Sequence, residues 1–81
     1  MGKPSRYDLT VYLVRKDEKY PASYPIYFEV FHSFDKLVRR CCNFESVDSL
    51  LCDHTYFEFE VFDENRGEFV INDIVEVFRN A

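Results

Sequence analysis

Two glutamates separated by one residue, Glu58 and Glu60, are the carboxylate pair with the clearest chemical potential in this 81-residue chain. They lie in the stretch YFEFEVF at residues 56–62, where the alternation of residue types predicts a β-strand. Both side chains therefore point to the same face, about 7 Å apart. Glycoside hydrolases use carboxylates at such separations, but a short chain with a packed sheet has little room for a sugar-binding cleft. We expect this pair to keep a strand face soluble or to bind a partner.

The three cysteines and two histidines are the other candidates for metal binding or nucleophilic chemistry. Structural zinc sites use cysteine pairs separated by two to four residues, whereas Cys41 and Cys42 are adjacent. Cys52, Asp53 and His54 are the residue types of a catalytic relay, but consecutive side chains diverge and cannot hydrogen-bond in series. We therefore predict no catalytic residue, no metal site and no cofactor, with Cys41 in the core.

Two more strands and a helix are expected ahead of this stretch. Residues 7–14 (YDLTVYLV) and 26–32 (IYFEVFH) alternate with a period of two. Residues 15–25 are polar and contain two prolines, so a long loop is expected there. Ser33 is a suitable N-cap, and Asn43 a reasonable terminator. Between them an apolar stripe at helical spacing consists of Phe34, Leu37, Val38 and Cys41.

After the first helix, the sequence predicts a short helical turn, a further turn and more strands. A short second helical turn is expected from Ser46, with Val47, Leu50 and Leu51 as its apolar contacts. Turn residues at positions 63–67 separate the strand at residues 56–62 from another at residues 68–71. Residues 72–80 fit a helix or a fifth strand, and their β-branched residues favour the strand.

Together these elements predict an α+β fold of a single domain. It consists of an antiparallel sheet of four to five strands with one main helix packed on one face, in the order ββα(α)βββ. Residues 1–6 are expected to be a flexible tail and residues 7–81 the domain. In the second strand the more hydrophobic alternate set is expected to face inward. The predicted core of the sheet is Leu9, Val11, Leu13, Ile26, Phe28, Val30, Phe57, Phe59 and Val61.

The opposite face of the predicted sheet combines carboxylates with aromatic rings. Residues 27–31 and 56–62 both present acidic side chains between aromatic ones. Aromatic residues ringed by charge are typical of interface anchors, whereas a solvated face mostly carries small polar residues and lysine. The turn after residue 62 adds two acidic residues. The candidate partner-binding residues are Tyr27, Glu29, Phe31, Tyr56, Glu58, Glu60, Phe62, Asp63 and Glu64.

The charge balance indicates which partner such a face would bind. Ten basic and fifteen acidic residues give a formal net charge of −5, which disfavours direct binding to nucleic acid or an anionic membrane. RNA-binding sheets also display aromatic residues, but with basic neighbours. We therefore expect a basic protein surface as the partner. The odd number of cysteines and the lack of a signal-peptide pattern predict a cytoplasmic location.

Two short motifs carry a family resemblance. Tyr7-Asp8-Leu9-Thr10 at the start of the first strand and Tyr27-Phe28-Glu29 in the second, followed by a short helix and a strand, resemble the small uracil-DNA glycosylase inhibitors of Bacillus phages. The resemblance spans residues 7–61, and the chain departs from the family pattern at residues 15–25, at residues 44–53 and in its C-terminal strands.

This resemblance implies an acidic β-β-α-β protein that dimerises and occupies the DNA-binding cleft of the host glycosylase. In that family, negative charge and a hydrophobic pocket that captures the DNA-inserting residue of the enzyme provide the binding. The resemblance implies that negative charge comes from Glu29, Glu58 and Glu60, and apolar contact from Tyr27, Phe31 and Tyr56.

We therefore expect a small, acidic, non-catalytic inhibitor of phage type. It would block a host nucleic-acid-handling protein with a basic cleft, either a uracil-DNA glycosylase or a CRISPR effector, by DNA mimicry. The alternative is a homodimeric interaction or assembly domain, with its aromatic face buried between two copies and no nucleic-acid enzyme as target.

Overall fold

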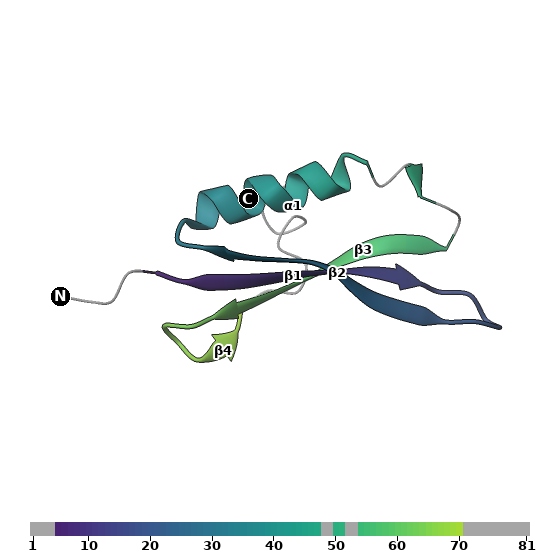
Figure 1. Cartoon of the computed structure of the whole chain (residues 1–81), viewed down its shortest axis with the longest axis horizontal. Coiled ribbons are helices and arrows are strands. Elements are labelled where there is room, and N and C mark those ends of the chain that lie inside the picture. The colour runs from purple at the N-terminus through teal and green to yellow at the C-terminus, as the bar shows by residue number, and fades with distance from the viewer. Residues whose placement is uncertain (1–4, 48–49, 52–53, 71–81) are drawn as a thin grey trace.

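The computed structural model describes residues 5–47, 50–51 and 54–70, in which one helix packs on one face of a four-stranded antiparallel sheet (Figure 1). The elements in chain order are β1 (Tyr7–Arg15), β2 (Ala22–Phe31), α1 (Phe34–Glu45), β3 (Thr55–Asp63) and β4 (Glu68–Phe69). Their order across the sheet is β2-β1-β3-β4. The predicted α+β fold is confirmed. The predicted strand or helix at residues 72–80 lies outside the described residues.

The core lies between α1 and the two central strands. Leu9 of β1 pairs with Val61 of β3, and Val11 pairs with Phe59, which brings four buried apolar side chains onto one face. The helix covers them with its apolar stripe. Its fully or almost fully buried members are Leu37, Val38 and Cys41. The alternation of residues in β1 and β3 therefore assigned the core faces of both strands correctly.

Helix α1 begins where its sequence predicted and ends later. The Oγ atom of Ser33 accepts a hydrogen bond from the backbone N–H of Lys36, at 3.4 Å, which confirms the N-cap. The expected end at Asn43 is wrong, because the helix continues to Glu45. The two additional helical residues place the ring of Phe44 against those of Tyr27 and Phe57, at centroid distances of 5.2 and 5.4 Å.

The short helical turn expected after α1 is present, but two of its three expected apolar residues are exposed. The backbone N–H of Leu50 donates to the carbonyl oxygen of Val47, which closes a single turn. The side chains of Val47 and Leu50 are exposed, whereas that of Leu51 is half-buried. Among the described residues, no helix is long and apolar enough to cross a membrane.

The strand β2 has the opposite orientation to the one expected. Its register with β1 pairs Leu9 with Glu29 and Tyr7 with Phe31, so these two β2 residues face the helix. Phe31 is 7% exposed, whereas Phe28 is 61% exposed on the other side. The placement of Ile26, Phe28 and Val30 in the core is therefore wrong. Only two residues connect β2 to α1, so the last residue of the strand is turned under the helix.

The expected loop at residues 15–25 is also shorter in the structure. The strand β1 continues to Arg15 and β2 begins at Ala22, which leaves residues 16–21 as the connection. Pro25 is accommodated inside β2 because this is an edge strand, where a missing N–H need not break a ladder. Beside it the register shifts, since Val11 pairs with Tyr27 and Tyr12 pairs with Pro25. Ile26 is thus the extra residue of a β-bulge.

The orientation of β2 can be tested with a matched pair of phenylalanines. Truncating the buried ring in Phe31→Ala should lower the free energy of unfolding by about 3–5 kcal/mol. Phe28→Ala should change it by about 0.5 kcal/mol or less, because that ring already contacts water. Urea denaturation followed by circular dichroism measures both. A larger loss for Phe28→Ala than for Phe31→Ala would contradict the register described above.

Candidate functional site

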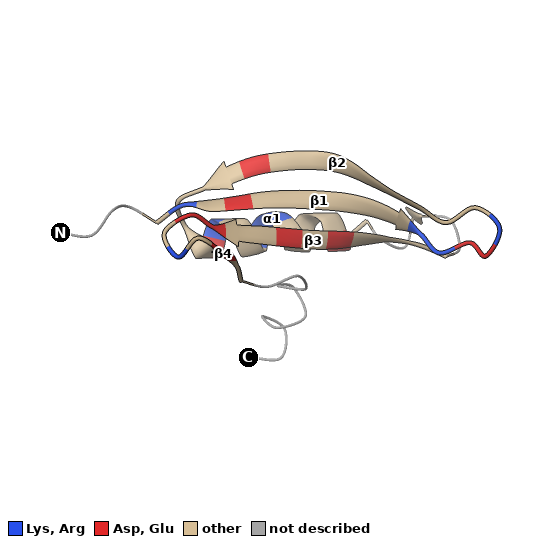
Figure 2. Cartoon of the chain, turned by 90° about the horizontal axis from the view of Figure 1, so that it is seen from below, with Lys and Arg blue, Asp and Glu red and all other residues tan. Residues whose placement is uncertain are grey.

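The sheet face opposite α1 is the candidate site, and we call it the outer face. Alternate residues of three neighbouring strands form it, while α1 lies behind the sheet (Figure 2). Its members are Asp8, Thr10, Tyr12, Val14, Phe28, Val30, Tyr56, Glu58, Glu60 and Phe62. The outer face therefore combines apolar, aromatic and acidic side chains on one continuous surface.

Charge on this face is distributed unevenly. Figure 2 shows acidic residues within β1, β2 and β3, of which Glu29 on β2 faces the helix, whereas Lys and Arg mark the strand ends, the loops and the helix behind them. Asp8 on β1 and Glu60 on β3 lie on neighbouring strands. Glu58 lies two residues before Glu60, on the same face of β3. The β2 side of the face is apolar, with Phe28 opposite Thr10 and Val30 opposite Asp8. An acidic half and an apolar half thus lie side by side.

A tyrosine hydrogen bond links the two central strands on the outer face. The hydroxyl of Tyr12 donates to Oε1 of Glu60 at 3.4 Å. Partial desolvation raises the pKa of Tyr12 above its ordinary value of 10.0, and the neighbouring charge of Glu60 and this hydrogen bond add to the effect. Tyr12 therefore remains a neutral hydrogen-bond donor that holds one carboxylate in place.

A second acidic pair lies at the end of the face where the β3–β4 turn begins. A hydrogen bond between the carboxyl groups of Glu64 and Asp8 raises the pKa of Glu64, with smaller contributions from desolvation and from the charge of Asp8. Arg6 opposes this shift, and its Nε lies 3.1 Å from Oδ1 of Asp8. The backbone N–H of Glu64 donates to the carbonyl oxygen of Arg6, which keeps the turn beside β1.

Three of the predicted partner-binding residues lie on the helix side of the sheet instead. Phe31 is a core residue, and Tyr27 packs against Phe44. The hydroxyl of Tyr27 donates to Glu29, whose Oε1 lies 3.5 Å from Nε of Arg40. The outward placement of these residues is corrected, because the register of β2 with β1 turns all three toward α1.

Asp63 has a structural role in the turn after β3. It is 7% exposed, and its Oδ1 accepts hydrogen bonds from the backbone N–H groups of Asn65 and Arg66, at 2.9 and 3.2 Å. The turn ends at Gly67, whose φ of 68° suits a residue without a Cβ. The carboxylate of Asp63 is therefore engaged within the turn rather than presented on the outer face. This Asx turn positions Glu64 beside Asp8.

The other predicted strand residues lie together on the outer face, where apolar residues of β2 lie beside them. Tyr56, Glu58, Glu60 and Phe62 all occupy the outer face, as their alternation predicted. The residues that sequence reasoning placed elsewhere are Phe28, Val30 and the bulge residue Ile26. Phe28 and Ile26 are exposed to 61% and 46%. The signal that could have revealed the outward orientation of these side chains is the short connection to the helix. With only two residues between β2 and α1, the last strand residue, Phe31, lies under the helix, and its alternate neighbours face outward.

This arrangement is suited to binding. The carboxylates of the outer face supply charge and hydrogen-bond acceptors, and the rings supply apolar area. Within the described residues, no group of three or more His, Cys, Asp or Glu side chains is positioned to hold a metal ion. A scan of protein-family models and searches of curated proteins and of solved structures each found no match to this chain.

Two aspartates with the same local chemistry test the role of Asp63. Asp17 in the β1–β2 loop also accepts two backbone hydrogen bonds, but its side chain is 32% exposed, against 10% for Asp63. Asp63→Ala should lower the free energy of unfolding by about 1–3 kcal/mol, because it leaves poorly hydrated N–H groups unpaired. Asp17→Ala should lower it by less than about 1 kcal/mol, because water replaces the carboxylate. Equal losses in urea denaturation would contradict this account.

The Asp8–Glu64 contact predicts an elevated titration midpoint. Carbon-detected NMR of the Glu64 carboxyl group should give a pKa above the ordinary 4.5, and Asp8→Ala should lower it. A raised pKa means that the folded state binds this proton more tightly than the unfolded state. The resulting stabilisation is present at acid pH and is lost as the pH rises through the folded-state pKa. An unchanged Glu64 midpoint in Asp8→Ala would refute the contact.

Proposed function

We propose that this protein is a small, non-catalytic inhibitor of phage type that binds the basic cleft of a host nucleic-acid-handling protein through its outer face. The target is a uracil-DNA glycosylase or a CRISPR effector, and the site of action is the cytoplasm of the host cell. The observation that supports this proposal is the position of Asp8, Glu58 and Glu60 on one face of the sheet, where the described strands present no row of basic residues (Figure 2). A cleft that binds DNA phosphates offers the complementary charge.

The apolar half of the outer face adds a second requirement for the partner. Phe28 and Val30 lie beside the acidic half, and the ring of Phe62 packs against Phe69 of β4 at a centroid distance of 5.0 Å. A protein surface can cover such rings, whereas the phosphate backbone of nucleic acid cannot. Charge would therefore steer the encounter, and the aromatic side chains would set the lifetime of the complex.

Charge reversal on β3 tests the proposal directly. Glu58→Lys with Glu60→Lys should abolish inhibition of a purified uracil-DNA glycosylase or CRISPR nuclease, at a cost of about 2–5 kcal/mol in binding free energy. Glu18→Lys with Glu68→Lys is the matched control, because it makes the same change in net charge away from the outer face. Glu18 is exposed in the β1–β2 loop, and Glu68 is exposed on β4, where it pairs with Asp63. The control should inhibit like the wild type. Circular dichroism checks that both variants are folded.

The salt dependence of binding separates this function from the alternative. The association rate with the target should fall steeply between low and physiological ionic strength. An assembly domain would instead elute as a dimer on a sizing column, would resist high salt, and would dissociate in Phe28→Asp. A wild-type dimer of that kind that inhibits neither class of enzyme would overturn the proposal.

A further inference from the structure

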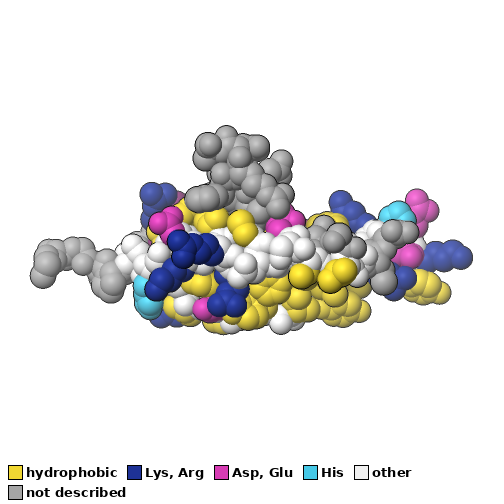
Figure 3. Space-filling view, turned by 90° about the horizontal axis from the view of Figure 1, so that it is seen from above, with side chains coloured by type: hydrophobic (Ala, Val, Ile, Leu, Met, Phe, Trp, Pro, Cys, Tyr) yellow, Lys and Arg dark blue, Asp and Glu magenta, His cyan; other side chains and the backbone are white. Residues whose placement is uncertain are grey.

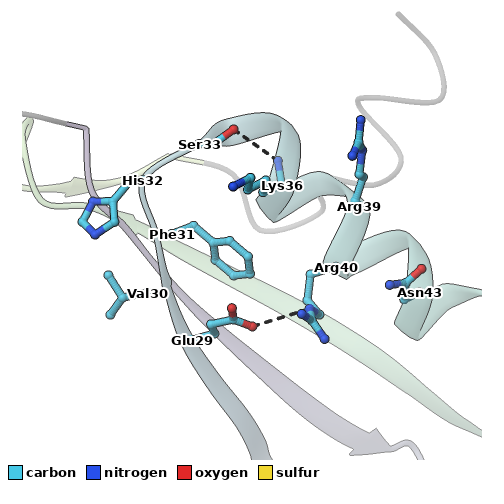
Figure 4. A pocket seen from close by; sticks show the side chains of 9 residues that line it. All are labelled: Glu29, Val30, Phe31, His32, Ser33, Lys36, Arg39, Arg40 and Asn43. Carbon is cyan, nitrogen blue, oxygen red and sulfur yellow. Dashed lines mark hydrogen bonds and ion pairs between the residues drawn. The ribbon is translucent and has the colours of Figure 1, made fainter.

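A groove of about 490 Å³ lies between the edge of β2 and α1, on the helix side of the sheet. Figure 4 shows that Glu29 and Phe31 point from β2 toward the helix, while Val30 points away. The first two turns of α1 contribute Lys36, Arg39 and Arg40 to its wall. Seen from the helix side, Lys and Arg side chains lie next to hydrophobic ones (Figure 3). This groove is thus basic in a chain whose net charge is −5.

The charges in the groove do not cancel. Arg40 forms an ion pair with Glu29, with Nε 3.5 Å from Oε1, and its guanidinium lies 5.9 Å from the ring centroid of Tyr27. That pair neutralises the one acidic side chain in the wall of the groove. Lys36 and Arg39 are exposed, and neither forms an ion pair with a described carboxylate. Lys36 and Arg39 therefore line the groove without an ion pair to a described carboxylate, although the side chain of Arg39 points away from β2 (Figure 4).

The β2 strand also has an unused backbone edge at this place. Among the described strands it pairs with β1 alone, so one row of its N–H and C=O groups has no strand partner. Proteins commonly protect such edges with prolines, bulges or very short strands. The first half of β2 has Pro25 and the bulge at Ile26, and the opposite edge of the sheet is the two-residue strand β4. Residues 27–31, which border the groove, have neither proline nor bulge.

We propose that residues 27–31 of β2, together with Lys36 and Arg39 of α1, bind an extended acidic peptide segment of a partner protein by strand addition. The backbone of the peptide pairs with the open edge, which extends the sheet to five strands. Alternate side chains of an added strand point to opposite faces. The segment therefore alternates acidic residues, which point toward α1, with apolar residues, which continue the outer face beside Phe28 and Val30.

Charge complementarity favours this occupant over two others. A second copy that paired through β2 would bring another Lys36 and Arg39 to the same edge, where like charges repel. A nucleic acid would meet cations on one side of the edge and the carboxylates of the outer face on the other. An acidic strand satisfies both the backbone groups and the cations. This inference does not depend on the proposed function, which concerns the opposite face and a basic partner.

The test uses the full-length protein and a fluorescein-labelled nine-residue peptide of alternating valine and glutamate, with binding followed by fluorescence anisotropy. Two further peptides are N-methylated at alternate amides, one at the odd and one at the even positions. Strand addition uses one row of peptide amides, so one methylated peptide should lose binding and the other should retain it. Arg39→Glu should weaken binding of the unmodified peptide about tenfold. Lys19→Glu, the same charge change in the β1–β2 loop, should leave it unchanged.

Each other outcome would overturn the inference. Equal binding of both methylated peptides would show attraction by charge alone. Equal weakening by Arg39→Glu and Lys19→Glu would place the peptide outside the groove, and a wild-type dimer that excludes the peptide would assign the edge to a second copy. Glu58→Lys with Glu60→Lys should retain peptide binding, so failure of the outer-face function and failure of this site are distinguishable.

Discussion

The pairing of β1 with a strand on each side is the constraint on which the rest of the structure depends. Leu9 and Val11 meet Val61 and Phe59 on β3, and α1 seals these four side chains from water. The same two β1 residues pair with Glu29 and Tyr27 on β2. Since side chains alternate along a strand, this register decides which of residues 27–31 of β2 face the helix and which face outward.

That register gives the two sides of the sheet different chemistry. On the outer face, the carboxylates of β1 and β3 lie beside the apolar side chains of β2. On the helix side, Arg40 compensates Glu29, and Lys36 and Arg39 leave the groove basic. A net charge of −5 therefore describes neither surface by itself. The chain presents an acidic, aromatic face and a basic edge, which suit partners of opposite charge.

Hydrophobicity alone favours the wrong face of β2. Its two alternate sets are Ile26, Phe28 and Val30 against Tyr27, Glu29 and Phe31, and the first set is the more apolar. The second set is nevertheless inside, because Glu29 has both a cation and a tyrosine hydroxyl as partners there. Tyr27 completes an aromatic cluster with Phe44, which the helix supplies only because it continues past Asn43. A charged residue is tolerated in this half-buried position, where 33% of the Glu29 side chain stays exposed, because it is paired in this way.

The sequence by itself determined the order of the described elements, the fold class and the inner faces of β1 and β3. Alternation, the Ser33 cap and the apolar stripe of α1 are local signals, and each depends only on residues a few positions apart. Only the tertiary structure decided the orientation of β2 and the position of the basic groove. These depend on pairing between residues distant in sequence, such as Leu9 with Glu29, and on the short connection that turns Phe31 under the helix. A period of two defines two faces of a strand, but the contacts with other elements select the one that is buried.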